Sequence, residues 1–582
     1  MKMLFQIATY LTVGILMMAS ACHSPQSSLD PKAPLLQGLG DHTLDITTDS
    51  TLAETYFNQG FNLTYGFNHD EAERSYREAV RQDSTCAMCY WGVAQVLGSN
   101  YNVAMSDDVK QEASRMIKLA QQYAEDVSDW ERGLIEATAL RYNYDKSDEQ
   151  PVLDADYAEA LRQLHEQLPE HIDIAALYAE ALMILHPWDL YTRDGQPKAW
   201  TPQITALLEE ILKKAPDHAG AHHLYIHAVE ASAKPEVGLA SADKLGSLMP
   251  GAGHIVHMPS HIYIRTGKYH EGSVVNEKAI EVDSLYLDAC ASQGVYPLML
   301  FPHNIHFLAA TAAFEGRGET SINAAYRVAA HTDTTVIREE GWQTLQHYLM
   351  IPHYVLVKFA QWDHILTLEQ PDEDLLYPNA VWQYARGMAF AGKGQLTKAR
   401  QALAEVKKTG QNPALAEITI WDLNSAVQLV QIAERVLEAE ILRKEGKRKE
   451  AITLLKEAVE IEDQLNYNEP PDWFFSVRHP LGAVLLEDGQ YAEAEKVFLE
   501  DLFFLPENGW ALNGLYQSLS KQNKQNEAAE VKKRFEEAWQ YADIALESSE
   551  VKAMAYQNIS GEAPFGSYLA SIQQFAMCGK SN

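Results

Sequence analysis

The sequence predicts an all-α fold, a superhelical solenoid built from α-helical hairpins. Three observations predict it. No segment after the N-terminal apolar run keeps the apolar/polar alternation of a half-buried strand. Apolar residues instead recur at helical spacing along the chain. Pairs of small residues also return twelve positions apart, as expected where the two helices of a hairpin approach closely.

The N-terminal segment has the pattern of an export signal. Lys2 precedes an apolar run, Leu4–Met18, that is short for a membrane span, and small residues at 19–21 lead to Cys22. A cysteine in this place resembles a bacterial lipobox, although Ala19 stands where leucine is commonest. The resemblance implies a signal peptide at 1–21 and lipidation of Cys22. A plain signal peptide or an uncleaved anchor is the alternative.

This interpretation predicts a location in the cell envelope. His23 follows Cys22 where an aspartate would suggest retention in the inner membrane, so we expect a lipid anchor in the outer membrane of a Gram-negative bacterium. Residues 22–50 are polar and contain Ser and Pro, which predicts a tether.

The repeat unit appears first at 56–84. There, small and aromatic residues match positions 8, 20, 24 and 27 of the 34-residue tetratricopeptide (TPR) pattern: Gly60, Ala72, Tyr76 and Ala79. The same frame returns further along the chain, at Gly387/Ala399, at Ala439/Ala451, and at Gly482, Ala494, Phe498 and Pro506. Several independent matches at one spacing predict a TPR-type solenoid.

These matches divide the mature chain into three parts. We expect an N-terminal TPR solenoid at 51–365 with histidine-rich repeats at 219–330, C-terminal TPR repeats at 366–545, and a C-terminal helix or tail at 546–582. Pro-containing breaks at 370–378 and 468–472 are either hinges or, the interpretation we favour, long loops between repeats.

Histidine is concentrated in the middle repeats, where ten of the 21 lie between His218 and His306. In the repeat frame these residues share positions 2, 5, 9 and 12, which lie along one face of each first helix. In TPR proteins that face lines the concave groove. We therefore expect a ligand groove formed by His223, His227, Glu230, His254, His257, His261, His303 and His306.

Four of these histidines are candidate metal ligands. His223/His227 and His257/His261 are i, i+4 pairs on neighbouring helices, which should pack about 8–10 Å apart. Imidazoles from both helices can then share one divalent ion such as zinc, at about 2.0–2.1 Å. Glu230 would be a further ligand or would fix a histidine tautomer. The alternative is that duplication of a repeat copied hydrogen-bonded groove histidines.

Three segments around these histidines resemble signature segments of a bacterial family of long TPR-domain proteins: 223–232, 253–264 and 302–308. Segments 86–92 and 478–482 resemble further landmarks of that family, and the resemblance extends from about Tyr56 to Asp543. It implies a TPR solenoid. Because the family usually carries no assigned activity, the resemblance does not name a substrate.

Cys86 and Cys89 form a CxxC motif at the junction of two repeats. Such a pair can be a small disulfide, two packed thiols, a redox centre or half of a metal site. No second CxxC lies nearby, so we expect a structural role. Another local feature, His186–Asp189, predicts a loop with an aromatic plug, and nothing in the sequence requires this loop to reach the mouth of the groove.

The net charge and the absence of catalytic motifs exclude some classes of function. The formal net charge of −33 opposes binding to a phosphate backbone, so we expect no nucleic-acid partner. P-loop, nucleophile-elbow, HExxH and dinucleotide motifs are absent, and we assign no catalytic residue. The sequence predicts a binding scaffold whose histidine-lined groove recognises a peptide, protein or small ligand, with membrane contact through the lipid alone. The alternative is a metal-binding protein or a metal-dependent hydrolase.

Overall fold

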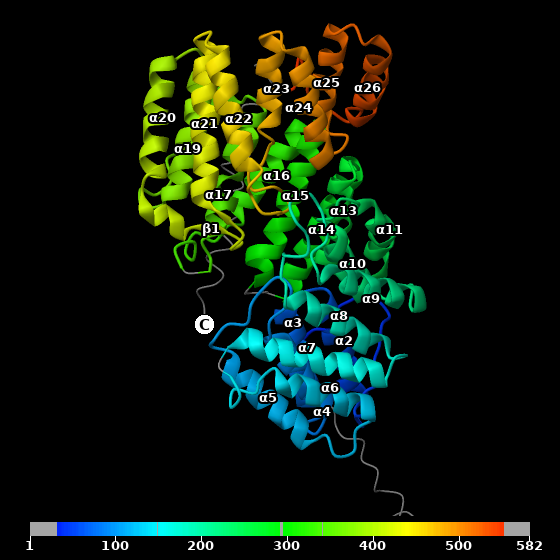
Figure 1. Ribbon diagram of the computed structural model, residues 1–582. Coiled ribbons are helices and arrows are strands. Elements are labelled where there is room, and N and C mark those ends of the chain that lie inside the picture. Colours follow the sequence, from blue (N-terminus) through cyan, green and yellow to red (C-terminus); the bar gives the residue numbers. More distant parts are fainter. Residues whose placement is uncertain (1–31, 148, 291–294, 340, 552–582) are drawn as a thin grey trace, which may run out of the picture.

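The computed structural model describes residues 32–147, 149–290, 295–339 and 341–551. In these ranges almost all regular structure is helical, and consecutive helices pack as hairpins along a superhelix (Figure 1). The predicted all-α, TPR-type solenoid is confirmed. Cys22 and the expected signal peptide lie outside the described residues. None of the described helices is both long and apolar enough to cross a membrane.

The superhelix starts with seven helices: α2 (Thr51–Tyr65), α3 (His69–Gln82), α4 (Ala87–Leu97), α5 (Lys110–Gln122), α6 (Asp129–Leu140), α7 (Gln150–Gln167) and α8 (Ile172–Ile184). The middle contains α9 (Thr201–Lys214), α10 (Ala219–Val229), η1 (Pro235–Gly238), α11 (Leu239–Leu248), α12 (Gly253–His257), α13 (Pro259–Arg265), α14 (Tyr269–Cys290), η2 (Tyr296–Leu300), α15 (Phe301–Phe314) and α16 (Gly318–Ala330).

The remaining elements form the C-terminal part. They are α17 (Leu345–Lys358), α18 (Trp362–Ile365), α19 (Leu376–Gly392), α20 (Leu396–Gly410), η3 (Pro413–Glu417), β1 (Thr419–Ile420), β2 (Asn424–Ser425), α21 (Ala426–Lys444), α22 (Arg448–Glu462), α23 (Arg478–Glu487), α24 (Tyr491–Phe504), α25 (Gly509–Lys521) and α26 (Gln525–Ala538). The strands β1 and β2 form a two-stranded antiparallel hairpin.

The small residues of the repeat frame lie where helices touch. Gly60 of α2 faces the ring of Tyr76 on α3, and a Cβ atom at Gly60 would lie 2.9 Å from that ring. Gly482 of α23 faces Phe498 of α24 even more closely, since a Cβ atom there would lie 2.2 Å from the ring Cζ. Any side chain at these positions would push the hairpin apart.

Residues 32–50, the described part of the expected tether, are packed against the first hairpin. Leu39, Leu44 and Ile46 are buried. The Leu44 backbone N–H donates to Asn58 Oδ1 at 2.7 Å, and Tyr56 Oη donates to the Ala33 carbonyl at 2.8 Å. This segment therefore forms a cover over α2.

The C-terminal repeats return to the middle of the chain. The Trp510 indole N–H donates to the Ala313 carbonyl at 2.8 Å, and Arg265 Nη1 donates to the Phe504 carbonyl at 2.9 Å. Figure 1 shows α23–α26, in orange, beside α15 and α16, in green. The superhelix thereby encloses the inner faces of its middle helices.

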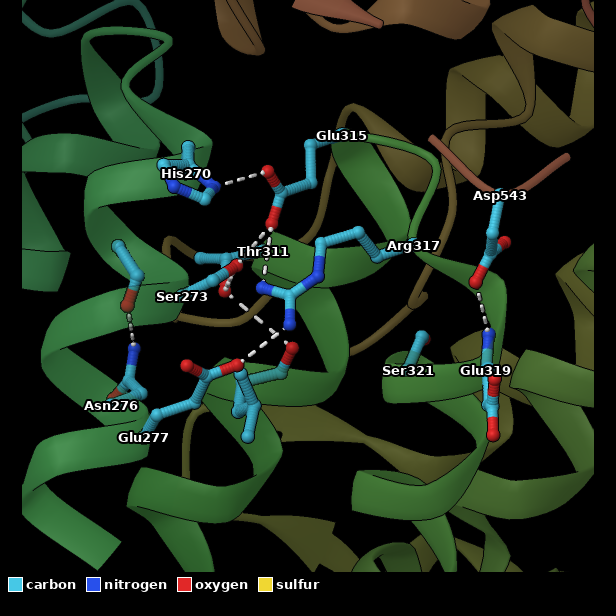
Figure 2. A network of polar contacts seen from close by, with 12 residues as sticks. His270, Ser273, Asn276, Glu277, Thr311, Glu315, Arg317, Glu319, Ser321 and Asp543 are labelled. Atoms are coloured by element: carbon cyan, nitrogen blue, oxygen red, sulfur yellow. Dashed lines mark hydrogen bonds and ion pairs between the residues drawn. The ribbon is translucent and has the colours of Figure 1, made fainter. Parts of the chain in front are cut away.

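A polar network fixes α14 against α15 and α16 (Figure 2). Glu315 accepts hydrogen bonds from Ser273 Oγ at 2.7 Å and from His270 Nδ1 at 3.0 Å. Asp543, from the C-terminal segment, accepts from the backbone N–H groups of Gly318 and Glu319, where its negative charge is favourable at the start of α16. These contacts set the position of α14 along its neighbours.

The CxxC motif is a buried disulfide between Cys86 and Cys89. Cys86 is the N-cap of α4, and its sulfur accepts the backbone N–H of Cys89. The sequence alone allowed a disulfide, two packed thiols, a redox centre or half of a metal site, and in the structure the two cysteines form a disulfide.

Replacing Gly482 by alanine should destabilise the fold. The added methyl group overlaps the Phe498 ring, and overpacking of this kind costs about 1–3 kcal/mol. Urea unfolding followed by circular dichroism should show a lower midpoint. Gly246→Ala, in α11, is the matched control, because its Cβ would meet only ordinary contacts at 3.8 Å or more and should raise the midpoint slightly. Equal midpoints for the two variants would contradict the packing argument.

Candidate metal centre

Six histidines form two adjacent groups of three inside the superhelix. The first triad is His223, His227 and His254, and the second triad is His257, His261 and His303. In each triad, one ligand atom from each histidine lies within 4.8 Å of the other two. Helix α10 supplies His223 and His227, α12 supplies His254 and His257, α13 supplies His261, and α15 supplies His303.

In the first triad, hydrogen bonds orient two of the three imidazoles. His223 Nδ1 donates to the Tyr65 carbonyl at 2.6 Å, and His227 Nδ1 donates to Glu230 Oε1 at 3.1 Å. Because Nδ1 carries the proton in both rings, each Nε2 has a lone pair. Neither Nε2 makes a hydrogen bond, and neither nitrogen of His254 makes one.

In the second triad, the facing nitrogens are already at ligand spacing. His257 Nδ1 donates to Asn276 Oδ1 at 2.6 Å, which leaves the lone pair on Nε2. That Nε2 lies 3.0 Å from His261 Nε2. Two lone pairs cannot face each other at this distance, so either a proton or a metal ion must lie between the two rings. Asn276 is held by α14, the helix that the polar network of Figure 2 fixes in place.

Two buried carboxylates support the triads from behind. His261 Nδ1 lies 2.7 Å from Glu230 Oε2 and 3.0 Å from Glu469 Oε2. Glu230 therefore contacts a histidine of each triad, His227 and His261. A carboxylate against the outer nitrogen of a metal-bound histidine fixes the tautomer and makes the ring a better ligand.

The electrostatics keep most of the ligands neutral. Burial, with the neighbouring imidazoles, holds the pKa values of His223, His254 and His257 well below the usual 6.5. His261 differs. Burial lowers its pKa, but Glu230 and Glu469 outweigh that effect and raise the pKa to about 9. In the metal-free protein His261 is thus the imidazolium that donates to His257.

Each triad has its own phenylalanine cover. The Phe67 ring lies 4.2 Å, centroid to centroid, from His223, and the Phe307 ring lies 4.5 Å from His261. Phe67 has a φ of +53°, an unusual conformation for a bulky residue that the surrounding packing must hold. Trp188, in the loop predicted as an aromatic plug, lies edge-on to His227 at 5.7 Å.

These residues fit a metal ion. Tetrahedral bonds of about 2.0–2.1 Å place ligand atoms about 3.3 Å apart, so triads whose atoms lie within 4.8 Å need only a small contraction. Imidazole nitrogens without thiolate suit zinc, copper, nickel or iron. The strongest indication is that His223, His227 and His254 each have a buried nitrogen without a hydrogen-bond partner, in a triad whose ligand atoms lie within 4.8 Å of one another.

A third cluster, His42, Asp173 and His218, has the right composition but a different hydrogen-bond pattern. His218 Nδ1 accepts the Ala221 backbone N–H at 3.0 Å and so caps α10. Its Nε2 must therefore carry the proton, which it donates to Asp173 at 3.1 Å. With both ring nitrogens used, His218 has no lone pair for a metal.

The structure brings together most of the residues that the sequence singled out. All four predicted metal ligands belong to the triads, and His254 and His303, expected only as groove residues, complete them. His306 lies elsewhere, stacked on Phe474 at 5.0 Å. The triad histidines do not line an open groove, since those on α10, α12 and α13 are at most 3% exposed and His303 is half-buried.

Sequence reasoning missed the residues that orient the ligands. Glu469 lies in the Asn-Glu-Pro-Pro-Asp loop between α22 and α23, which the sequence indicated only as a break between repeats. Asn276 and Tyr65 come from α14 and α2, and Tyr65 acts through its backbone carbonyl. Nothing in the spacing of the repeats identifies these residues. Tyr65 and Glu469 reach the triads from distant parts of the chain, and Asn276, 19 positions after His257, matches no motif.

Comparisons with known proteins give no family. No protein-family model matches the chain, and no curated protein matches its sequence. Among solved structures, the human IFIT1 dimer with m7Gppp-AAAA is similar over 77% of this chain and 89% of its own, with 13% identity and a TM-score of 0.34. The APC/C hetero-tetramer Cut9-Hcn1 is similar over 84% of this chain and 77% of its own, with 15% identity and a TM-score of 0.29.

Proposed function

We propose that this protein binds two transition-metal ions, one at each histidine triad, in the interior of a closed helical superhelix. One observation carries the proposal. The inward nitrogens of His223, His227 and His254 are buried without hydrogen-bond partners. The outward nitrogens of His223 and His227, in contrast, donate hydrogen bonds to a backbone carbonyl and to a carboxylate. This is the arrangement of a metal site with its supporting hydrogen bonds.

The two triads are close enough to form one centre. The His227 and His261 rings lie 5.5 Å apart, and the His254 and His257 rings lie 5.7 Å apart. Glu230 contacts both triads, so binding at one site changes the charge balance at the other. Zinc remains the simplest candidate for the ion, and copper suits the same all-imidazole set.

Burial argues for metal binding over recognition of a peptide by these histidines. His223 and His257 are 0% exposed, and the Phe67 and Phe307 rings cover the triads. A peptide lying in an external groove could not touch them. A small ion reaches such a centre through brief local opening, at the half-buried His303 side or elsewhere.

Metal content tests the proposal directly. Protein produced without a polyhistidine tag and incubated with Zn²⁺ should retain about two ions per chain after desalting, measured by elemental mass spectrometry. The His257→Ala/His261→Ala variant should lose at least one ion, because it removes two ligands of one triad. His42→Ala/His218→Asn is the matched control, with asparagine keeping the helix cap, and should bind as the wild type does. Equal, substoichiometric metal in all three proteins would refute the proposal.

Replacing Glu230 by glutamine should weaken binding without removing a triad histidine. The amide lacks the charge that orients His227 and His261, and loss of such support typically costs about 10–100-fold in affinity. Competition with a chromophoric chelator measures the change. Glu236→Gln, an exposed glutamate in η1, is the control and should leave the affinity unchanged. An unaltered affinity for Glu230→Gln would mean that the carboxylate only balances the His261 charge.

A specific cavity favours a second candidate, a metal-dependent hydrolase for small molecules. Glu469, which contacts His261, also lines a cavity of about 110 Å³ together with Arg265 and Tyr467. Burial raises the pKa of Glu469 to about 7, which suits a group that takes up and releases a proton near neutral pH.

Hydrolysis of p-nitrophenyl acetate by the zinc-loaded protein tests this second candidate. Glu469→Gln should lower the rate by about 100-fold or more, the usual contribution of a general base. Metal content is measured on the same sample, so a loss of the ion is distinguished from a loss of the base. If the zinc-loaded wild type is no faster than free Zn²⁺, the hydrolase role is wrong, whereas metal binding is unaffected.

A further inference from the structure

A second cavity lies between α17, α19, α21 and α23 and shares no residue with the triads. Its volume is about 360 Å³. Aromatic and apolar side chains form much of its wall: Tyr354, Trp362, Tyr384, Met388, Trp473 and Phe475. Two groups that can exchange a proton, Lys358 and His479, also line it.

Lys358 and His479 form a relay with a buried aspartate. Lys358 Nζ lies 2.8 Å from His479 Nδ1, and His479 Nε2 lies 3.0 Å from Asp501 Oδ2. Since the Asp501 carboxylate only accepts, His479 Nε2 carries the proton and its Nδ1 has the lone pair. Lys358 therefore donates to His479. Asn508 Nδ2 donates to the same oxygen of Asp501 at 3.0 Å and holds it in place.

This order of groups is that of a nucleophile, a base and a group that orients the base. The amine takes the place that a hydroxyl or thiol has in hydrolases. The aspartate fixes the histidine tautomer and stabilises the imidazolium that forms when the histidine takes a proton.

The surroundings of Lys358 favour a reactive amine. Its Nζ lies 3.8 Å from the centroid of the Trp510 ring and 5.3 Å from that of Phe475. The faces of these rings, like the charges of Glu550 and Asp501, favour the ammonium, but burial outweighs these effects and lowers the pKa of Lys358 to about 7. A substantial fraction of the side chain is then neutral at pH 7, whereas an exposed lysine is almost wholly protonated.

We propose that Lys358 is the nucleophile of a carbonyl-binding site, which forms a Schiff base with an aldehyde or ketone held in the cavity. The proposal is independent of metal binding at the triads. It rests on the Lys358–His479–Asp501 geometry and on the cavity beside it.

The chemistry balances without another reagent. His479 takes a proton from the Lys358 ammonium, and the neutral amine attacks the carbonyl carbon. A C–N bond forms while the carbonyl π pair moves to oxygen. The His479 imidazolium protonates that oxygen, and His479 then takes a proton from the attached nitrogen, which gives the neutral carbinolamine. Loss of water from this carbinolamine gives the imine, so one carbonyl compound and one amine yield one imine and one water.

The charges of the cavity select the ligand class. Arg443 is paired with Glu487 at 2.6 Å, with Glu550 at 2.8 Å and with Glu440 at 3.3 Å. With its guanidinium surrounded by carboxylates, Arg443 offers no site for an anionic group. The aromatic wall therefore suits an uncharged aldehyde or ketone with an aromatic or apolar body.

Reductive trapping on the wild-type chain tests the proposal. The protein is treated at pH 7 with limiting benzaldehyde and sodium cyanoborohydride, which converts an imine into a stable benzylated lysine, and tryptic peptides are quantified by mass spectrometry. Lys358 should be modified at least about tenfold faster than Lys408 and Lys533, whose side chains are each 78% exposed. Modification no faster than at these two lysines would overturn the proposal.

A variant tests the relay itself. His479→Asn should slow benzylation of Lys358 by about tenfold or more, because the proton acceptor is lost. His165→Asn, on α7, should leave the rate unchanged. Thermal unfolding shows whether the His479→Asn protein is folded. If it is not, the comparison of Lys358 with the two exposed lysines in the wild-type protein remains the test of the proposal. A folded His479→Asn protein that reacts at the wild-type rate would show that His479 has no part in activating the amine.

Discussion

A buried imidazole nitrogen without a partner costs about 1–3 kcal/mol, and the centre of this protein depends on that penalty. The first triad alone has unpartnered nitrogens on three histidines, and they converge. Unpartnered nitrogens also occur on single buried histidines such as His306 and His353, whereas His218 uses both ring nitrogens. The surrounding elements orient the triads so that the penalty falls on the inward nitrogens, where an ion can remove it.

In the second triad, a proton lies between two imidazole rings. His261 is held as an imidazolium between two carboxylates, and its Nε2 proton lies between the rings of His257 and His261. An ion that takes the place of this proton keeps the positive charge where Glu230 and Glu469 already compensate it. Binding therefore requires little rearrangement of the buried charges. The first triad has no such proton, which makes the two sites unequal although the same type of ligand forms both.

The sequence predicted the fold well because TPR packing depends on local spacing. Gly60 and Tyr76 lie on the two helices of one hairpin, as do Gly482 and Phe498, and their close approach follows from the pattern alone. The same register predicted which histidines share the inner face of the first helices. It did not predict that the face would be closed. Burial of the triads depends on contacts such as Phe67 with His223 and Glu469 with His261, which join residues more than 150 positions apart and produce no periodic pattern in the sequence.

The orienting residues were unpredictable for a similar reason. Tyr65 contributes a carbonyl, which every residue has, and Asn276 is one amide among many on a helical surface. The Lys358–His479–Asp501 relay likewise combines α17, α23 and α24, with 121 positions between the lysine and the histidine. Contacts between residues this far apart in sequence form only when distant repeats of the solenoid pack against each other.

The loop that contains Glu469 has a consequence for how the protein matures. The triad histidines are all present once residue 303 has been synthesised, but the second carboxylate against His261 arrives 166 residues later, from beyond α22. A nascent or truncated chain therefore holds the imidazoles without their full counter-charge and without the covering C-terminal repeats. If the triads bind an ion as proposed, its tight retention would report that the C-terminal repeats have docked on the middle of the chain.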